Sequence, residues 1–111
     1  MAHLTVLNGS NYGRVAPLQP GHVCRLGRDP ALELSIDDPK ASRLHVEIEY
    51  KDDQWTLRDK QSKNGTFVNG QRVSTAVLKE GDEVQVGETR LAFSLRDAVR
   101  EPSRGPDDSM M

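Results

Sequence analysis

Three short segments, far apart in the sequence, carry side chains that are suited to holding an anion. They are Gly27-Arg28, Ser42-Arg43 and Lys63-Asn64-Gly65, and each lies where a predicted strand meets a loop. An arginine guanidinium presents a planar set of donors that matches phosphate oxygens, and a serine hydroxyl or a loop N–H adds further donors. An asparagine amide both donates and accepts, which suits a peptide backbone. If these junctions meet at one end of the fold, the segments together can hold a phosphate.

Other chemistries find less support in the sequence. Cys24 lies in the apolar-leaning run "HVCRLG", where a small buried thiol is commoner than a nucleophile. His3, His22 and His45 are scattered, and neither a CxxC nor an HExxH pattern occurs. The glycine pair of "GSNYGR" lacks the lysine and the following helix of a P-loop. We therefore predict no catalytic residue, no metal and no cofactor, and we do not expect an enzyme.

Length and charge narrow the class of protein. The 111 residues fit one domain, and the net charge of -2 comes without the basic stripe of a nucleic-acid binder. No stretch approaches the roughly 18 apolar residues of a membrane span, and the first residues lack the features of a signal peptide. The single cysteine fits a reducing compartment. We expect a cytoplasmic domain that binds neither nucleic acid nor membrane.

The elements that must position the three segments are strands, because apolar and polar residues alternate with a period of two. In "LHVEIEYK", Leu44, Val46, Ile48 and Tyr50 alternate with polar residues. The runs "HLTVLNG", "QWTLRD", "EVQVG" and "TRLAFSLR" repeat this pattern. Since successive side chains of a strand point to opposite faces, each run predicts one buried and one solvated face.

Turn-forming residues separate these runs, and no helical periodicity precedes residue 96. They include Asn8-Gly9, Pro20-Gly21, Asp29-Pro30, Asp37-Asp38-Pro39, Asp52-Asp53, Asn64-Gly65, Asn69-Gly70 and Gly81-Asp82. Many short strands with such spacing indicate an all-β, antiparallel sandwich or barrel. Because successive side chains of a strand point to opposite faces, either Phe67 or the pair Thr66 and Val68 should point into the core and anchor the short strand between the two Asn-Gly turns.

The end of the chain differs from the rest. Residues 97–111 are polar, carry two prolines and present no apolar face. We therefore predict a domain over residues 1–96 and a polar flexible tail or linker over 97–111, which can lead into a further domain.

The ordered motifs resemble those of the forkhead-associated (FHA) domain family. They run from Gly27-Arg28 through Ser42-Arg43-Leu44-His45 and Asn64-Gly65-Thr66 to Asn69-Gly70, and the resemblance covers about residues 1–96. Each pair alone is uninformative, whereas the ordered set is specific. The resemblance implies an antiparallel β-sandwich of about eleven short strands that binds phosphothreonine peptides through loops at one end.

The resemblance also implies roles for the ligand-facing residues. Arg28 and Ser42 would contact the phosphate, and Arg43 would reach either the phosphate or a peptide residue on the C-terminal side of it. Asn64 would hydrogen-bond the peptide main chain and help to shape a notch for the threonine methyl group. Lys63 departs from the family pattern, which often has Thr or Ser there. Its ammonium group would add charge in place of a hydroxyl, on a less pre-organised side chain.

A second set of residues is expected to support these loops rather than to touch a ligand. The resemblance gives Gly27, His45 and Gly65 structural roles in the loops, and Asn69 and Gly70 a turn that supports a neighbouring loop. His45 lies on the polar side of its strand, and we expect a scaffold hydrogen bond there.

The predicted function is recognition of a threonine-phosphorylated protein, the product of a Ser/Thr kinase, in phosphorylation-dependent signalling. The threonine methyl group should favour phosphothreonine over phosphoserine. The alternative is a phosphate-independent interaction or assembly domain that uses a sandwich face or a sheet edge.

Overall fold

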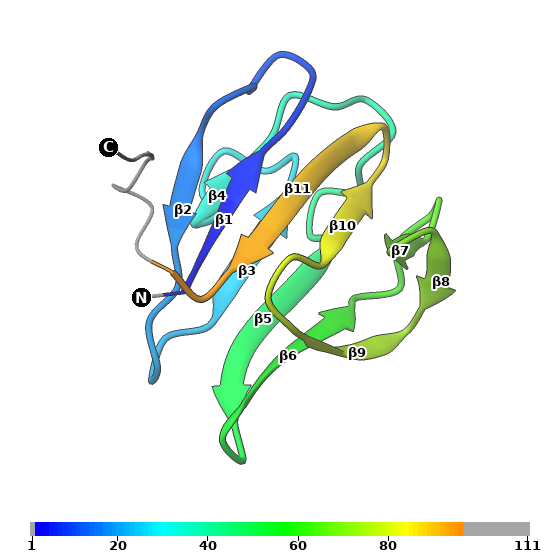
Figure 1. The fold of residues 1–111 in the computed structure, drawn as a ribbon. Coiled ribbons are helices and arrows are strands. Elements are labelled where there is room, and N and C mark those ends of the chain that lie inside the picture. The colour runs from blue at the N-terminus through cyan, green and yellow to red at the C-terminus, as the bar shows by residue number, and fades with distance from the viewer. Residues whose placement is uncertain (1, 97–111) are drawn as a thin grey trace, which may run out of the picture.

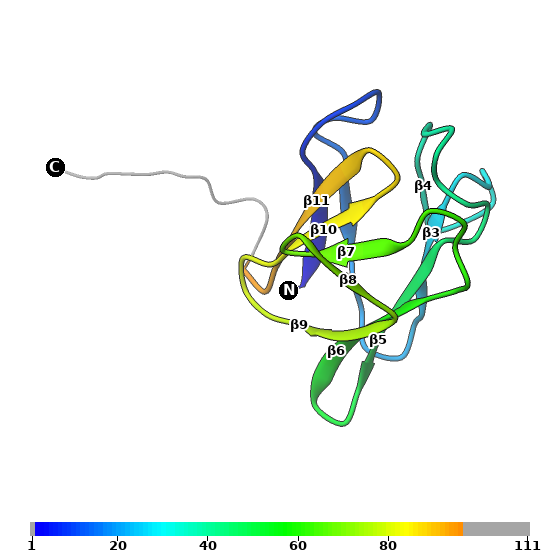
Figure 2. The ribbon, with the colours of Figure 1, turned by 90° about the vertical axis from the view of Figure 1, so that its right-hand side faces the viewer.

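Two β-sheets pack face to face in the computed structural model, which describes residues 2–96 (Figures 1 and 2). The predicted tail, residues 97–111, lies outside the described residues. In spatial order, the six-stranded sheet contains β2 (Val15–Pro17), β1 (His3–Val6), β11 (Thr89–Ser94), β10 (Glu83–Val86), β7 (Thr66–Val68) and β8 (Gln71–Val73). The five-stranded sheet contains β4 (Leu34–Ser35), β3 (Cys24–Gly27), β5 (Val46–Lys51), β6 (Gln54–Asp59) and β9 (Thr75–Leu78).

The predicted all-β sandwich of about eleven short strands is confirmed. Every regular element between residues 2 and 96 is a strand, and all pairings except one are antiparallel. The exception is the short parallel pair of β3 and β4. Within the described residues there is no helix long and apolar enough to cross a membrane.

The alternation that predicts the central hairpin holds over its middle. Val46 and Ile48 of β5 are buried, as are Trp55 and Leu57 of β6. The pattern weakens at the hairpin end, where Tyr50 is 39% exposed and its ring centroid lies 5.1 Å from that of Trp55. The hydrophobic core therefore does not extend as far as the β5–β6 turn.

The short strand between the two Asn-Gly turns is anchored by Thr66 and Val68, which are buried, whereas Phe67 is half-buried. Asn69 and Gly70 both have positive φ, 51° and 85°. A two-residue hairpin turn of this kind matches the twist of its strands. The Asn-Gly pair thus lets β8 follow β7 directly.

Sheet topology brings the three predicted ligand segments to one end of the molecule. β3 and β4 run parallel, β5 runs opposite to β3, and β6 runs opposite to β5. The ends of β3, β4 and β6 and the beginning of β5 therefore share one end of the five-stranded sheet. Loops 28–33, 36–45 and 60–65 lie there, on the right-hand side of Figure 2.

Candidate functional site

The loop that follows β3 rests directly on the segment before β5. The N–H of Arg28 donates to the Ser42 carbonyl oxygen at 3.0 Å, and the N–H of Asp29 donates to that of Arg43 at 3.2 Å. A β-carbon at Gly27 would lie 2.1 Å from the Arg43 carbonyl oxygen, closer than van der Waals contact allows. Only glycine lets the two backbones approach so closely, which gives Gly27 its place in the sequence.

The Arg28 side chain is exposed and is held by one hydrogen bond. Its Nε donates to the carbonyl oxygen of Ala41 at 2.6 Å. A guanidinium has five N–H donors, so this bond fixes the direction of the group and leaves its two Nη nitrogens to a ligand. The side chain is therefore positioned before any anion arrives.

Ser42 connects two of the loops and keeps a donor. Its Oγ accepts a hydrogen bond from the N–H of Lys63 at 3.0 Å. Because the oxygen acts as an acceptor there, the hydroxyl proton can be donated to another group. Ser42 is half-buried, so this donor is anchored by the β6–β7 loop and still reachable from solvent.

His45 lies beneath this junction, fully buried, and joins the same two loops. Its Nδ1 accepts a hydrogen bond from the N–H of Ser42 at 2.9 Å, so Nδ1 carries no proton. The proton must then be on Nε2, which donates to the Gly65 carbonyl oxygen at 2.8 Å. His45 is thus a buried link between the two loops and makes no contact with the outer surface.

Asn64 joins the β6–β7 loop to the 36–45 loop. Its Nδ2 donates to the Lys40 carbonyl oxygen at 2.8 Å, while the side chain remains exposed. The bond fixes which end of the amide faces inward, so Oδ1 is left to accept from a ligand N–H. Gly65 follows with a φ of +86°, and a β-carbon there would lie 2.7 Å from Arg72 Nε. Both facts favour glycine at this position.

An acidic residue that the sequence analysis does not single out organises the β6–β7 loop. Asp59 accepts hydrogen bonds from the Thr66 hydroxyl at 2.6 Å, from the Ser62 N–H at 3.1 Å and from the Ser62 hydroxyl. Burial alone would raise the pKa of Asp59, but the hydrogen bonds from Ser62 and Thr66 outweigh it and the net pKa is lowered. The Asp-x-x-Ser spacing, typical of a turn that a carboxylate caps, is the sequence signal that could have revealed it.

Asp38 does more than the turn formation that its sequence context predicts. The carboxylate is buried and accepts from Lys40 N at 2.9 Å, Glu88 N at 2.8 Å and Thr89 Oγ1 at 2.7 Å. Burial opposes its ionisation, yet the bonds from Thr89 and from backbone N–H groups lower the net pKa. Asp38 thereby fastens the 36–45 loop to the β10–β11 hairpin.

The remaining predicted ligand residues are exposed cations. The Arg43 side chain is 76% exposed and lies 3.7 Å from an Asp29 carboxylate oxygen. Lys63 is exposed and contributes its backbone N–H to Ser42. A solvated pair such as Arg43–Asp29 is weak, so Arg43 can turn to a ligand at little cost.

The structure brings together Arg28, Ser42, Arg43, Lys63 and Asn64, as well as Gly27, His45 and Gly65, through the hydrogen bonds given above. The Asn69-Gly70 turn lies elsewhere, because Asn69 bonds to Asp82 Oδ1 and to Glu83 N, both at 2.9 Å. It braces the beginning of β10. The ligand-contacting roles of the clustered residues stay predictions.

The structure buries Cys24 and shows no cluster of metal-ligating side chains among the described residues. Cys24 is buried, and burial, followed by the charge of Glu33, raises the pKa of its thiol to about 11. A thiol with this pKa is a poor nucleophile near neutral pH. Among residues 2–96, no three His, Cys, Asp or Glu side chains cluster as metal ligands.

Comparison with known sequences gives relatives with regulatory names. The FHA domain model matches residues 24–87. The glycogen accumulation regulator GarA of Mycobacterium tuberculosis is 37% identical over 107 residues, which are 96% of this chain and 62% of the relative. The oxoglutarate dehydrogenase inhibitor of Corynebacterium jeikeium is 38% identical over 83% of this chain and 63% of its own length. The chain thus spans less than two thirds of these relatives.

Solved structures give the same fold. A structure described as a study of phosphothreonine-dependent FHA domain interactions has a TM-score of 0.78 and 29% identity, over 86% of this chain and 97% of that one. Mycobacterium tuberculosis EmbR, in complex with a low-affinity phosphopeptide, has a TM-score of 0.79 and 26% identity, over 90% of this chain and 26% of EmbR.

Proposed function

This chain belongs to the FHA domain family, and we propose from that membership that it binds threonine-phosphorylated proteins. It would recruit a partner after a Ser/Thr kinase has acted, and so make an interaction depend on phosphorylation. FHA domains are binding modules, and the phosphothreonine-dependent interactions and the phosphopeptide complex reported for the structural neighbours support the same activity here.

The observation that carries this proposal is that three polar side chains in the clustered loops are only partly used in hydrogen bonds within the protein. Arg28, Ser42 and Asn64 each form one hydrogen bond to a neighbouring loop, with donor–acceptor distances of 2.6 Å, 3.0 Å and 2.8 Å respectively. Each keeps at least one group for a ligand: guanidinium N–H groups, a hydroxyl proton and an amide oxygen. Two kinds of donor suit a phosphate and one acceptor suits a peptide N–H, which is the combination that a phosphorylated peptide requires.

The local charge also favours a phosphorylated ligand over an acidic one. A phosphate group brings about -1.5 to -2 charges and three strong acceptor oxygens, whereas a carboxylate brings one charge and two oxygens. Arg28, Arg43 and Lys63 are all exposed at this end. A glutamate in place of the phosphothreonine should therefore bind weakly.

We infer that the chain acts by binding and not by catalysis, and that it works in the cytoplasm. The buried Cys24 thiol with its raised pKa supports the first inference. That same unpaired thiol is in accord with a reducing compartment. The names of the longer relatives, a regulator and an inhibitor, support a role in which binding changes the activity of another protein.

The proposal is tested by calorimetry with a degenerate phosphothreonine peptide library and its unphosphorylated counterpart. Only the phosphorylated library should bind, and binding should weaken as salt rises, because exposed charges are screened. Arg28→Ala should remove the binding, whereas Arg90→Ala, a matched control at an exposed arginine paired with Glu83, should keep it. Equal binding of both libraries, or undiminished binding by Arg28→Ala, would refute the proposal.

A further inference from the structure

The arginine side chains of this structure differ in whether they have a partner. A guanidinium is always charged and carries five N–H donors, so it can hold an anion when these donors are unused. Between residues 2 and 95, all arginine side chains except that of Arg72 form a hydrogen bond or an ion pair within the described structure. The paired arginines are Arg14, Arg25, Arg28, Arg43, Arg58 and Arg90.

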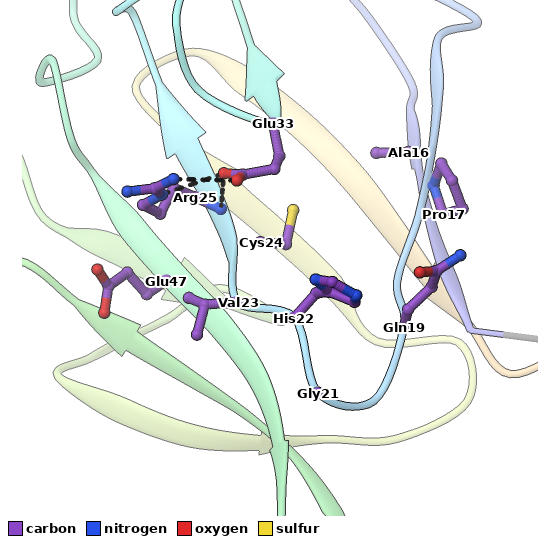
Figure 3. A pocket seen from close by; sticks show the side chains of 10 residues that line it. All are labelled: Ala16, Pro17, Gln19, Gly21, His22, Val23, Cys24, Arg25, Glu33 and Glu47. Atoms are coloured by element: carbon purple, nitrogen blue, oxygen red, sulfur yellow. Dashed lines mark hydrogen bonds and ion pairs between the residues drawn. The ribbon is translucent and has the colours of Figure 1, made fainter.

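Arg25 is an example of a guanidinium whose charge is already matched (Figure 3). Its Nε donates to Glu33 Oε1 at 3.2 Å, and its Nη2 donates to Glu33 Oε2 at 3.1 Å. The pair lies at an open hollow of about 710 Å³, which Pro17 and Cys24 also help to line. Because the two charges compensate each other, this pair does not attract an anion to the hollow.

Arg72 is positioned by its neighbour across the β7–β8 hairpin, which is Phe67. The N–H of Asn69 donates to the Glu83 carbonyl oxygen, so Phe67, two residues earlier, directs its backbone groups to β10 and not to β8. Phe67 and Arg72 therefore form a non-hydrogen-bonded pair, the kind in which facing side chains lie closest. Both side chains stand on the outer face of the sheet, because the residues on either side of Phe67 are buried.

The guanidinium of Arg72 lies against the backbone of Gly65 in the β6–β7 loop. A β-carbon added to Gly65 would lie 2.7 Å from Arg72 Nε, 3.0 Å from Cζ and 3.2 Å from Nη2. The charged group of Arg72, and not only its aliphatic stem, therefore borders Gly65. Since glycine has no side chain to push the group away, Arg72 can rest directly on the loop.

This contact leaves the donors of Arg72 unused. The Gly65 N–H donates to Ser62 Oγ at 3.0 Å, and the Gly65 carbonyl oxygen accepts from His45 Nε2 at 2.8 Å. Within residues 2–96, the Arg72 side chain forms no hydrogen bond or ion pair, and the residue is exposed. The β6–β7 loop thus carries an exposed cation beside it whose charge no carboxylate of this part of the chain matches.

Arg72 also lies at one side of the proposed phosphopeptide site. Gly65 directly follows Asn64, whose amide is bonded to the 36–45 loop and whose Oδ1 is left for a ligand. Arg72 belongs to the six-stranded sheet, whereas the 36–45 loop joins strands of the five-stranded sheet. A peptide that lies along Asn64 and leads away from the 36–45 loop therefore passes the Arg72 guanidinium.

We propose that Arg72 makes this site prefer phosphothreonine partners with an acidic residue close to the phosphothreonine, because its guanidinium pairs with that carboxylate. The inference rests on the proposed function and adds a rule for the choice of partner. A planar guanidinium matches the two oxygens of a carboxylate, so one acidic side chain takes two of its donors. An extended peptide advances about 3.3 Å per residue, so an acidic residue within about four positions of the phosphothreonine comes within reach.

The test uses degenerate phosphothreonine peptide libraries in which one position is fixed as glutamate or, in the matched library, as glutamine. The fixed position is moved along the peptide on both sides of the phosphothreonine. At one or two neighbouring positions, glutamate should strengthen binding about two- to fivefold over glutamine, the range for an exposed ion pair. These positions show on which side of the phosphothreonine the peptide passes Gly65. Arg72→Gln should remove the gain and leave binding of the glutamine libraries unchanged.

Arg90→Gln is the matched control for the loss of a positive charge. Arg90 is exposed and lies opposite Gln85, which lies opposite Phe67, so Arg90 shares the outer face of the sheet with Arg72. Arg90→Gln should leave the gain from glutamate unchanged. Arg72→Gln should keep the melting temperature within about 3 °C of the wild type, since it breaks no bond within the protein. Arg72→Glu should reverse the preference, so that lysine binds better than glutamate at the same position.

NMR of the labelled protein gives a direct readout of the pairing. The Nε resonance of Arg72 should shift with a peptide that carries the glutamate and not with its glutamine counterpart. If the glutamine libraries bind the wild type, but no gain from glutamate depends on Arg72, this inference is overturned and the proposed function stands. If no phosphothreonine library binds the wild type, both are overturned.

Discussion

Replacing Ser42 by alanine tests whether the junction between the loops also recognises the phosphate. In the free protein, Ser42 Oγ accepts from the exposed N–H of Lys63 at 3.0 Å. Ser42→Ala removes that bond, but water can reach the N–H that is left. The free energy of unfolding should therefore fall by about 0.5–1.5 kcal/mol, the value of one ordinary hydrogen bond.

The effect on phosphopeptide affinity should be larger than the effect on stability. A hydrogen bond from the Ser42 hydroxyl to a charged phosphate oxygen is worth about 1.5–3 kcal/mol. Since about 1.4 kcal/mol corresponds to a factor of ten, the dissociation constant should rise roughly 10- to 150-fold. The reason for the difference is that the bond to Lys63 is neutral and exposed, whereas the bond to phosphate is charge-assisted.

Calorimetry with a phosphothreonine peptide measures this change, and a thermal melt measures stability. Ser94→Ala is the control, because the exposed Ser94 hydroxyl donates to Glu80 Oε2 at 2.9 Å and accepts from the Arg96 N–H at 3.1 Å. It should lose at least as much stability as Ser42→Ala and no affinity. If Ser42→Ala binds the phosphopeptide within twofold of the wild type while folded, the hydroxyl does not face the phosphate and the assignment is refuted.

Three further changes test the scaffold. Gly27→Ala should lower the melting temperature and abolish phosphopeptide binding, because the new β-carbon would clash with the Arg43 carbonyl oxygen. Gly70→Ala is the control in both assays, because the φ there is +85° but no atom lies within 4 Å of the added β-carbon; it should lower stability only. Asp38→Ala should cost about 3 kcal/mol in chemical denaturation, since two part-buried N–H groups and the buried Thr89 hydroxyl lose a charged acceptor. Peptide affinity should fall with it, and a loss of stability under about 1 kcal/mol would contradict that role. Asp38 and Asp59 have lowered pKa values when folded, so their contribution to stability should be fully present above their ordinary value of 3.8 and be lost as the pH falls below it. Asp59→Asn should flatten that acid-side slope in a pH series of melts.

The sequence predicts the strands because their signals are local. Val46 and Ile48 alternate with charged residues, and the Asn69-Gly70 pair specifies its hairpin turn through positive φ, so neither needs distant information. The same parity argument could not decide between Phe67 and its neighbours. That choice depends on which face of β7 points into the core, and only the whole fold determines this.

The candidate site also has a part that the sequence predicts and a part that it does not. Arg28, Ser42 and Asn64 can be found from residue type and order. The contacts that hold them cannot, because Arg28 and Asn64 bond to carbonyl oxygens of other loops. The sequence predicts Asp38 only as a turn-forming residue, because its partners Glu88 and Thr89 are about half the chain away and come near it only when the chain folds.

Arg28 and Asn64 donate to the main-chain carbonyl oxygens of Ala41 and Lys40. This kind of anchor affects how the ligand preference of such a domain can change in evolution. A main-chain oxygen is common to all amino acids, so replacing the exposed side chain of Lys40 leaves the anchor in place, whereas the buried Ala41 is constrained by the core. Mutation at position 40 can therefore introduce new side chains beside the proposed ligand site without removing the hydrogen bonds that position Arg28 and Asn64. A lineage could in this way change its preferred neighbouring residues through small, individually viable steps.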